Sequence, residues 1–187
     1  MIGYAFSGSF CTFKRSFAVL RELIASGEEV LPIMSENAYT TDTRFAVARE
    51  FADRVEELCQ RKIVHTVKDA EPLGPSTPLE LLIIAPCTGN TLAKLASGIT
   101  DTAVTMAAKA HLRQDRRLII ALASNDAMSQ NLSNIGRLLT RRSVYFVPLV
   151  QDDPTGKPHS LVANFERIGE ALAAAREDRQ LRPLFLL

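Results

Sequence analysis

The stretch that decides the fold runs from Leu81 to Arg113 and reads LLIIAPCTGNTLAKLASGITDTAVTMAAKAHLR. It begins with an unbroken apolar run, Leu81 to Ala85, which is typical of a strand buried on both faces in a parallel sheet. Pro86 is expected to end that strand. Two helical segments follow, and Gly98 is expected to end the first of them. A buried strand followed by helices predicts a βα unit at the centre of an α/β domain.

The turn between this strand and its helix has the composition of a ligand site. Its residues, Cys87 to Asn90, are small or polar, and the hydroxyl of Thr88 or Thr91 is expected to cap the helix. Backbone N–H groups and the positive end of the helix dipole would converge at the carboxyl end of a strand, where open α/β sheets bind ligands. The turn is therefore a candidate anion site, with an ordinary βα turn as the alternative. Thr100 or Asp101 is the expected cap of the second helix.

Length and composition describe one domain of ordinary size. The chain has 187 residues, a formal net charge of +1 and 47% hydrophobic residues, so nothing marks it as a nucleic-acid or membrane-surface binder. Three widely spaced cysteines argue against a disulfide framework or a zinc cluster and fit a reducing cytoplasm. No apolar run is long enough to span a bilayer, and the N-terminus lacks a signal-peptide core. We expect a single domain over 1–187, with its core over about 2–149 and a C-terminal helix and tail over 150–187.

The N-terminus repeats the strand, turn and helix pattern. Ile2 to Phe6 predicts a strand, Ser7-Gly8-Ser9 a turn, and a helix is expected from about Thr12 to Ser26. Such a turn can hold a phosphate, because Gly8 lets the backbone approach and the serines add hydroxyl donors. The segment lacks both the full dinucleotide fingerprint and the Walker motif. A helix cap without a ligand therefore remains an alternative here.

Further strands and helices alternate along the rest of the chain. Pro32 places the second strand at an edge or a bulge, because proline cannot donate to a central ladder. The expected strands are Glu29 to Met34, Ile63 to Val67, Leu118 to Ala123 and Val144 to Leu149. The expected helices are Thr43 to Cys59, Asn131 to Arg142 and Leu161 to Arg176, and Asp69 to Pro78 is expected to be a loop. The apolar tail, LRPLFLL from Leu181 to Leu187, is expected either to fold back onto the body or to dock on another subunit.

This alternation predicts an α/β fold with three layers, α/β/α, around a mainly parallel sheet. Polar clusters follow four of the strands. They are Ser7-Gly8-Ser9, Ser35-Glu36-Asn37, Cys87-Thr88-Gly89-Asn90 and Ser124-Asn125. Because parallel strands end at the same edge of a sheet, four such clusters favour one ligand cleft over four unrelated turns.

The segment from Ala85 to Thr102, APCTGNTLAKLASGITDT, resembles a family signature, Pro-Ala-Ser/Thr-x-Asn-Thr-x-x-Lys-x-x-x-Gly-x-x-Asp, with Cys87 in the place of the alanine. The family is that of homo-oligomeric flavin-containing Cys decarboxylases and flavin prenyltransferases, called flavoproteins. The resemblance covers the chain from Ile2 to about Leu149. It implies a Rossmann-like fold, a single flavoprotein-like domain and a homo-oligomer. In this family the signature packs against flavin mononucleotide (FMN) and builds the subunit interface.

The resemblance also implies which residues bind the cofactor. They are Ser7, Gly8 and Ser9 for the FMN phosphate, and Ser35, Pro86, Thr88, Asn90, Thr91, Ser124 and Asn125 for the rest of the site. The match at ASNDAM is partial, because the family has Pro-x-Met-Asn there and in this chain Met128 follows the asparagine. No catalytic residue and no metal ligand is assigned.

The resemblance favours one branch of the family chemistry over another. The catalytic histidine of the decarboxylases has no counterpart, since His65, His111 and His159 fall in a short strand, at a helix end and in a late polar turn. Cysteine decarboxylation is therefore disfavoured. Within the family, the chain resembles more closely a branch of oxidoreductase subunits. This resemblance implies that the chain works with a separate A subunit carrying a nicotinamide-binding domain, which would supply NADP.

Together these two subunits would oxidise a dihydrodipicolinate-type intermediate to pyridine-2,6-dicarboxylate during sporulation, in the cytoplasm of the mother cell. A dicarboxylate calls for cations, and Lys94, Lys109 and Arg113 are the candidates. The alternatives are an FMN-dependent decarboxylase or prenyltransferase that acts alone, and a non-catalytic partner subunit that keeps the fold. The alanine-rich helix Thr102 to Ala110 and the tail Leu184 to Leu187 are the expected subunit contacts.

Overall fold

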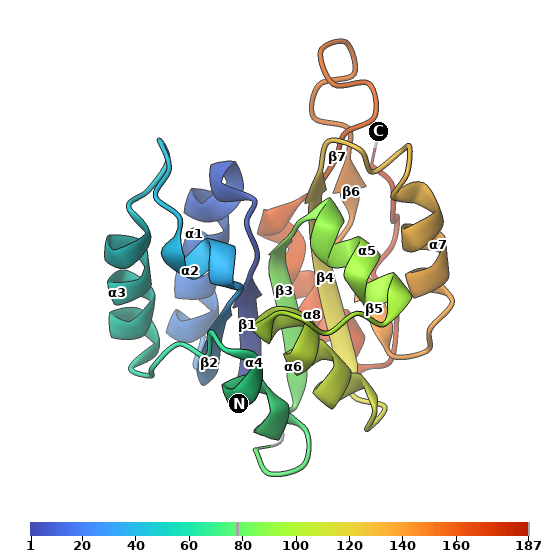
Figure 1. Cartoon of the computed structure of the whole chain (residues 1–187). Helices are drawn as coiled ribbons and strands as arrows, with labels where there is room; N and C mark the ends of the chain where they lie inside the picture. Colours follow the sequence, from blue (N-terminus) through green and yellow to red (C-terminus); the bar gives the residue numbers. More distant parts are fainter. Residues whose placement is uncertain (78, 187) are drawn as a thin grey trace.

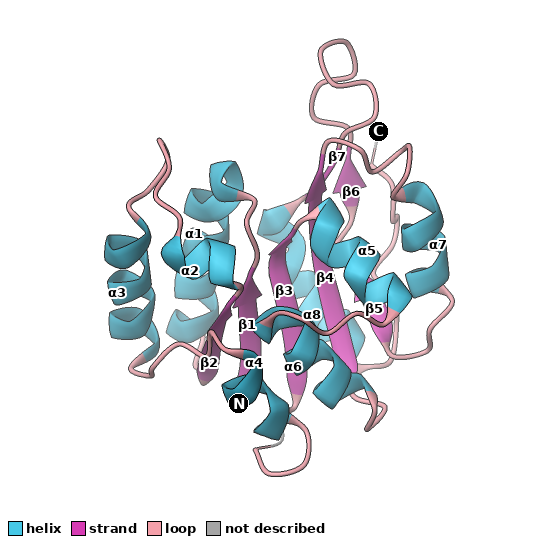
Figure 2. Ribbon diagram, in the orientation of Figure 1, coloured by secondary structure: helices cyan, strands magenta, loops and turns pink. Residues whose placement is uncertain are grey.

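The computed structural model describes residues 1–77 and 79–186 and has a seven-stranded sheet flanked by helices (Figures 1 and 2). The strand order is β2-β1-β3-β4-β7-β6, and β5 pairs with β4 off this path. The parallel strands are β1 (Ile2–Phe6), β2 (Val30–Met34), β3 (Leu81–Cys87), β4 (Arg117–Ser124) and β5 (Val144–Phe146). Two short strands, β6 (Leu149–Val150) and β7 (Leu161–Ala163), pair antiparallel. The predicted α/β class with a mainly parallel sheet is confirmed.

Helices cover both faces of this sheet. They are α1 (Phe13–Ala25), α2 (Glu36–Thr40), α3 (Ala48–Cys59), α4 (Val67–Ala70), α5 (Gly89–Ser97), α6 (Ala103–Leu112), α7 (Leu132–Leu139) and α8 (Ile168–Arg176). In Figure 1, α1 and α8 lie behind the sheet and α4, α5 and α6 lie in front of it. Every residue of β1 and β3 is buried, as expected of strands covered on both faces. The three-layer prediction is therefore confirmed.

The two prolines in strands behave differently. Pro32 lies in β2 at the edge of the sheet, as predicted, where its missing N–H costs no ladder bond. Pro86 does not end β3, because the strand continues to Cys87. The register against β4 shifts between Ile84 and Cys87, and proline is tolerated within a sheet at such an irregularity.

Several short elements differ from the prediction. The helix expected from Thr43 begins at Ala48, because a turn closed by the Thr43 N–H to Ala46 carbonyl bond (3.0 Å) precedes it. The Asp42 carboxylate accepts the N–H of Ala48 at 2.8 Å and holds the helix start there. The strand expected at Ile63 to Val67 is a single bridge between Ile33 and Val64. Helix α4 and a 3-10 helix (Glu71–Leu73) occupy much of the predicted loop, whose last residue, Pro78, lies outside the described residues.

The C-terminal quarter differs most. The strand expected from Val144 to Leu149 is two strands, β5 and β6, interrupted at Val147 and Pro148. The helix expected from Leu161 begins as strand β7, which pairs with β6 and β4, and becomes α-helical only at Ile168. Helix α7 spans Leu132–Leu139, a shorter range than predicted.

The apolar tail folds back onto the body, which was one of its two predicted positions. The N–H of Leu149 donates to the carbonyl of Leu184 at 2.7 Å, and the N–H of Leu186 donates to the carbonyl of Leu149 at 2.8 Å. The last tail residue, Leu187, lies outside the described residues. The alanines of α6 are buried within the chain, so the predicted alanine-rich subunit contact is not an exposed surface.

Candidate functional site

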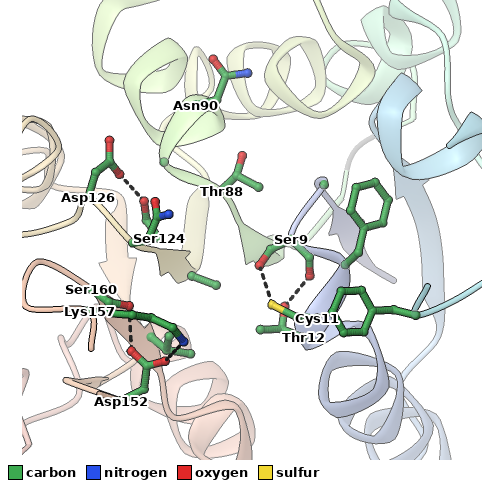
Figure 3. Close-up of a pocket in the computed structure, with 17 residues that line it drawn as sticks. Ser9, Cys11, Thr12, Thr88, Asn90, Ser124, Asp126, Asp152, Lys157 and Ser160 are labelled. Atoms are coloured by element: carbon green, nitrogen blue, oxygen red, sulfur yellow. Dashed lines mark hydrogen bonds and ion pairs between the residues drawn. The ribbon is translucent and has the colours of Figure 1, made fainter. Parts of the chain in front are cut away.

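A cavity of about 680 Å³ opens where β1, β3 and β4 reach their carboxyl ends (Figure 3). It is lined by the Gly8–Thr12 segment, the start of α5, the segment after β4, and the loop between β6 and β7. Small-molecule sites range over about 300–1,000 Å³ and favour this edge of an open α/β sheet. The cavity therefore has the size and position of a ligand site.

Six of the ten predicted cofactor-binding residues line this cavity. They are Gly8, Ser9, Thr88, Asn90, Ser124 and Asn125. They come from three of the four polar clusters, so the meeting of these three at one sheet edge is confirmed. The fourth cluster, Ser35-Glu36-Asn37, does not line this cavity, so the prediction of one cleft from all four clusters is wrong in that part. Their role in cofactor binding remains a prediction.

The other four predicted residues do not line the cavity. The Ser7 hydroxyl donates to the Pro86 carbonyl at 2.8 Å and accepts the N–H of Thr88 at 2.9 Å, which ties the turn after β1 to the end of β3. Thr91 is buried and its hydroxyl accepts from Thr88 at 3.0 Å. The Ser35 hydroxyl accepts the N–H of Ala38 and caps α2. The bonds of Ser7 and Thr91 fix the turns that carry lining residues, whereas the bond of Ser35 stabilises α2, which carries none.

Ser9 differs from Ser7 in that its hydroxyl is accessible to a ligand. Its only side-chain hydrogen bond among the described residues is a long one, 4.0 Å to the Cys11 sulfur. The helical segment that begins at Phe10 continues directly into α1, and its first residues, Phe10 to Thr12, line the same cavity as Ser9. A helix start next to an uncommitted hydroxyl suits a phosphate.

The start of α5 is built differently from the prediction. Thr88 is the cap, as expected, and accepts the N–H of Thr91 at 3.1 Å. The carboxylate of Asp126 lies against Gly89, the first residue of α5. It accepts hydrogen bonds from the Ser124 hydroxyl and, at 2.9 and 3.0 Å, from the Asn131 amide. The carboxylate of Asp126 therefore occupies the position at the start of α5 where the sequence predicted a bound anion.

Sequence reasoning missed Asp126, although it follows Ser124 and Asn125 directly. The signal available was an acidic residue just beyond a strand end, with two amides at Asn131 and Asn134 at the start of the next helix. Asn131 is buried, and its own carbonyl accepts from the Asn134 amide at 2.9 Å. This chain of hydrogen bonds holds the carboxylate in one orientation.

The predicted cations do not line the cavity, so that prediction is wrong. Lys94 pairs with both carboxylate oxygens of Asp101 at 2.8 Å. Lys109 and Arg113 line a separate cavity of about 290 Å³ beside α6. Among the described residues, the cation that does line the main cavity is Lys157, in the loop between β6 and β7. The sequence marked this stretch only as the late polar turn that holds His159.

None of the three histidines lines the cavity. His111 is fully buried, and its Nε2 lies 2.8 Å from the Arg117 carbonyl oxygen. Burial lowers the pKa of His111 to about 4, so the ring is neutral at neutral pH. The ring of His65 stacks on Tyr39 with the centroids 3.9 Å apart. No histidine is therefore placed to transfer a proton in the cavity.

The cysteines near the cavity differ in burial. Cys87 is fully buried, and burial raises the pKa of its thiol, which keeps it protonated. Cys11 is exposed and lines the cavity. Over residues 1–77 and 79–186 there is no group of three side chains that could hold a metal ion. None of the helices within these residues has the length and hydrophobicity that a membrane span requires.

Comparison with known proteins agrees with this architecture. The family model Flavoprotein matches residues 1–172. The B subunit of dipicolinate synthase of Bacillus subtilis (strain 168) is 38% identical over 185 residues, which cover 99% of this chain and 92% of that protein.

Two solved structures are also similar. The B subunit of dipicolinate synthase from Bacillus halodurans C superposes with a TM-score of 0.91 and 36% identity, and the match covers 100% of this chain and 95% of that one. A dodecameric FMN-dependent Ubix-like decarboxylase from Escherichia coli O157:H7 shares the fold, with a TM-score of 0.63, 22% identity, and coverage of 79% and 80% of the two chains. The strand-end cavity, the matched signature and these similarities lead to one assignment: the chain belongs to the Flavoprotein family and is a close homologue of the B subunit of dipicolinate synthase.

Proposed function

We propose that this chain acts as the B subunit of a dipicolinate synthase. With a nicotinamide-binding A subunit, it makes pyridine-2,6-dicarboxylate from a dihydrodipicolinate-type intermediate during sporulation. The observation that carries the proposal is 38% identity to such a protein over 99% of the chain, together with the polar cavity at the strand ends. The complex is an oxidoreductase, and this chain needs its partner for turnover.

The residues in the cavity fit FMN as the cofactor. A phosphate has the helix start at Phe10 and the hydroxyl of Ser9 on one side of the cavity. The side chains of Asn90 and Asn125, which line the cavity, would bind the polar edge of a flavin ring. Neither amide has a hydrogen-bond partner within the described part of the chain, so both are available to a ligand.

When bound, FMN supplies a ring that accepts and donates electrons. The chain's own residues bind and orient the ligands. Ser7 and Thr88 hold the turns after β1 and β3 against each other, so the two sides of the cavity keep a constant separation. Asp126, held by Ser124 and Asn131, presents a fixed hydrogen-bond acceptor to whatever lies beside α5.

The partner supplies the nicotinamide, as NADP, and the chain itself forms a homo-oligomer in the cytoplasm of a spore-forming mother cell. The oligomer is supported by the dodecameric relative that shares the fold. Phe185 in the folded-back tail remains 51% exposed and is the candidate subunit contact on this chain.

The test is reconstitution from purified proteins. This chain, its nicotinamide-binding partner, and their mixture are each supplied with the dihydrodipicolinate-type substrate and NADP, and pyridine-2,6-dicarboxylate is measured. The proposal predicts product from the mixture and, at most, a small amount from either protein alone. Full turnover by this chain alone, or decarboxylation or prenyl transfer by it, contradicts the proposal. Turnover by the partner alone, unchanged when this chain is added, leaves this chain as a non-catalytic relative.

A further inference from the structure

Within residues 1–77 and 79–186, three charged side chains line the main cavity, and their surroundings give them different roles. They are Asp126, Asp152 and Lys157. Asp126 is satisfied by Ser124 and Asn131 and lies against the start of α5. That end of the cavity is therefore negative and repels a ligand carboxylate. A ligand carboxylate that enters this cavity has to place its charge elsewhere.

Lys157 is the one lysine or arginine that lines this cavity among the described residues. It is carried by the loop that rises beyond β6 and β7 in Figure 1. In Figure 3 its side chain and Asp152 lie on the opposite side of the cavity from Ser9 and Cys11. The loop is held by its own hydrogen bonds, in which the N–H groups of Gly156 and Lys157 each donate to Asp153 at 2.8 Å.

The ammonium of Lys157 is held by one carboxylate and keeps further N–H donors. It contacts the Asp152 carboxylate at 3.2 Å, and the Ser160 hydroxyl fixes that carboxylate by donating to it at 2.7 Å. The Lys157 side chain remains 54% exposed, and an ammonium has three N–H donors. Asp152 raises the pKa of Lys157, so the group stays charged at neutral pH. One bond to Asp152 leaves N–H donors of a cavity-lining side chain for a ligand.

We propose that Lys157 binds a carboxylate of the dicarboxylic ligand of this cavity and selects the charged ligand over an uncharged one of the same shape. This inference rests on the proposed function, because it takes the dicarboxylate from it. A phosphate is the other oxyanion that an ammonium could bind. The phosphate of FMN already has the helix start at Phe10 and the Ser9 hydroxyl across the cavity, so the carboxylate is the group left for Lys157.

The test measures binding of pyridine-2,6-dicarboxylate and of its uncharged analogue, pyridine-2,6-dicarboxamide, by calorimetry on the FMN-treated whole chain. Lys157→Gln should weaken the dicarboxylate about tenfold and the dicarboxamide less than about twofold. Lys157→Arg should restore most of the loss. Lys109→Gln, which removes a lysine from the separate cavity beside α6, should change neither affinity. Added salt should weaken dicarboxylate binding more in the wild type than in Lys157→Gln.

The outcomes separate this inference from the proposed function. Equal effects of Lys157→Gln on both ligands overturn the inference and leave the proposed function standing. If Lys157→Gln loses FMN affinity tenfold and its affinity for the dicarboxylate is unchanged, Lys157 binds the phosphate. That result also overturns the inference. If the wild-type chain binds FMN but neither pyridine ligand, the proposed function and the inference both fail. Retention of the wild-type FMN affinity shows that the variant is folded.

Discussion

At the scale of single residues, the site depends on contacts that residue type alone does not reveal. Gly89 is an example, because the signature allows any residue there, yet the hydrogen-bonded group of Ser124, Asp126 and Asn131 packs directly onto it. The sequence could predict that Thr88 caps α5, since that depends on neighbouring residues. It could not predict that a carboxylate 37 positions away from Gly89 closes the helix start, because this depends on how β4 pairs with β3.

Gly89→Ala is expected to destabilise the protein, although alanine favours helices by about 1 kcal/mol. A Cβ at this position would lie 2.7 Å from both the Asn131 amide nitrogen and an Asp126 oxygen, so the group must shift. We expect a loss of about 1–3 kcal/mol in the free energy of unfolding, measured by urea denaturation. Gly136→Ala in α7 is the matched control, because nothing lies within 4 Å of its Cβ, and it should be neutral or stabilising. Equal effects of the two substitutions would contradict this account.

His111 is expected to make stability depend on pH. Its pKa is about 4 in the folded chain and about 6.5 when unfolded, so the unfolded state binds the proton first as the pH falls. Above about pH 6.5 the ring is neutral in both states, and His111 does not make the free energy of unfolding depend on pH. As the pH falls from about 6.5 to about 4, the free energy of unfolding decreases, and it is about 2 kcal/mol lower by about pH 5. Urea unfolding at several pH values should show this slope. His111→Gln keeps a donor for the Arg117 carbonyl and should flatten it, and an unchanged slope in that variant would assign the pH dependence to other groups.

At the scale of elements, the predicted strands and helices are confirmed where the segment is long and its hydrophobic pattern lies within the segment itself. The buried strands β1, β3 and β4 and the helices α1, α5 and α6 were expected, because apolar runs and helical periodicity mark them without reference to the rest of the chain. The short strands β6 and β7 were missed. Strands of two or three residues carry no measurable periodicity, and these form only because they pair with each other and with β4. Their loop carries Lys157, so this part of the site could not be predicted.

The cap of α6 gives a test at this scale. Thr102 and Thr105 form a reciprocal capping box, whereas the sequence suggested Thr100 or Asp101 as the cap. Thr102→Ala should lower the free energy of unfolding by about 1 kcal/mol, because it leaves helix N–H groups without an acceptor. Thr100→Ala should cost much less. Thermal unfolding of the two variants compares them directly, and a larger effect for Thr100→Ala would show that the helix begins earlier.

At the scale of the whole molecule, the position of the cavity follows from topology. A parallel sheet brings the carboxyl ends of β1, β3 and β4 to one edge, and the polar clusters after these strands meet there. This is why six of the ten predicted residues line the cavity. The remaining four, Ser7, Ser35, Pro86 and Thr91, do not line it. Sequence patterns do not distinguish a lining hydroxyl from one that caps a helix or ties two loops together.

The account depends most directly on the cavity being a flavin site. The decisive measurement is a titration of the purified whole chain with FMN, monitored by flavin fluorescence. The same titration is made on Ser9→Ala, Asn90→Ala and the control Ser133→Ala in α7. We expect the wild-type chain to bind FMN saturably. Ser9→Ala and Asn90→Ala should each weaken the affinity about five- to tenfold, because each removes one hydrogen bond to the ligand. The control should bind FMN like the wild type. Failure of the wild-type chain to bind FMN, or binding unaffected by both cavity substitutions, would contradict the account.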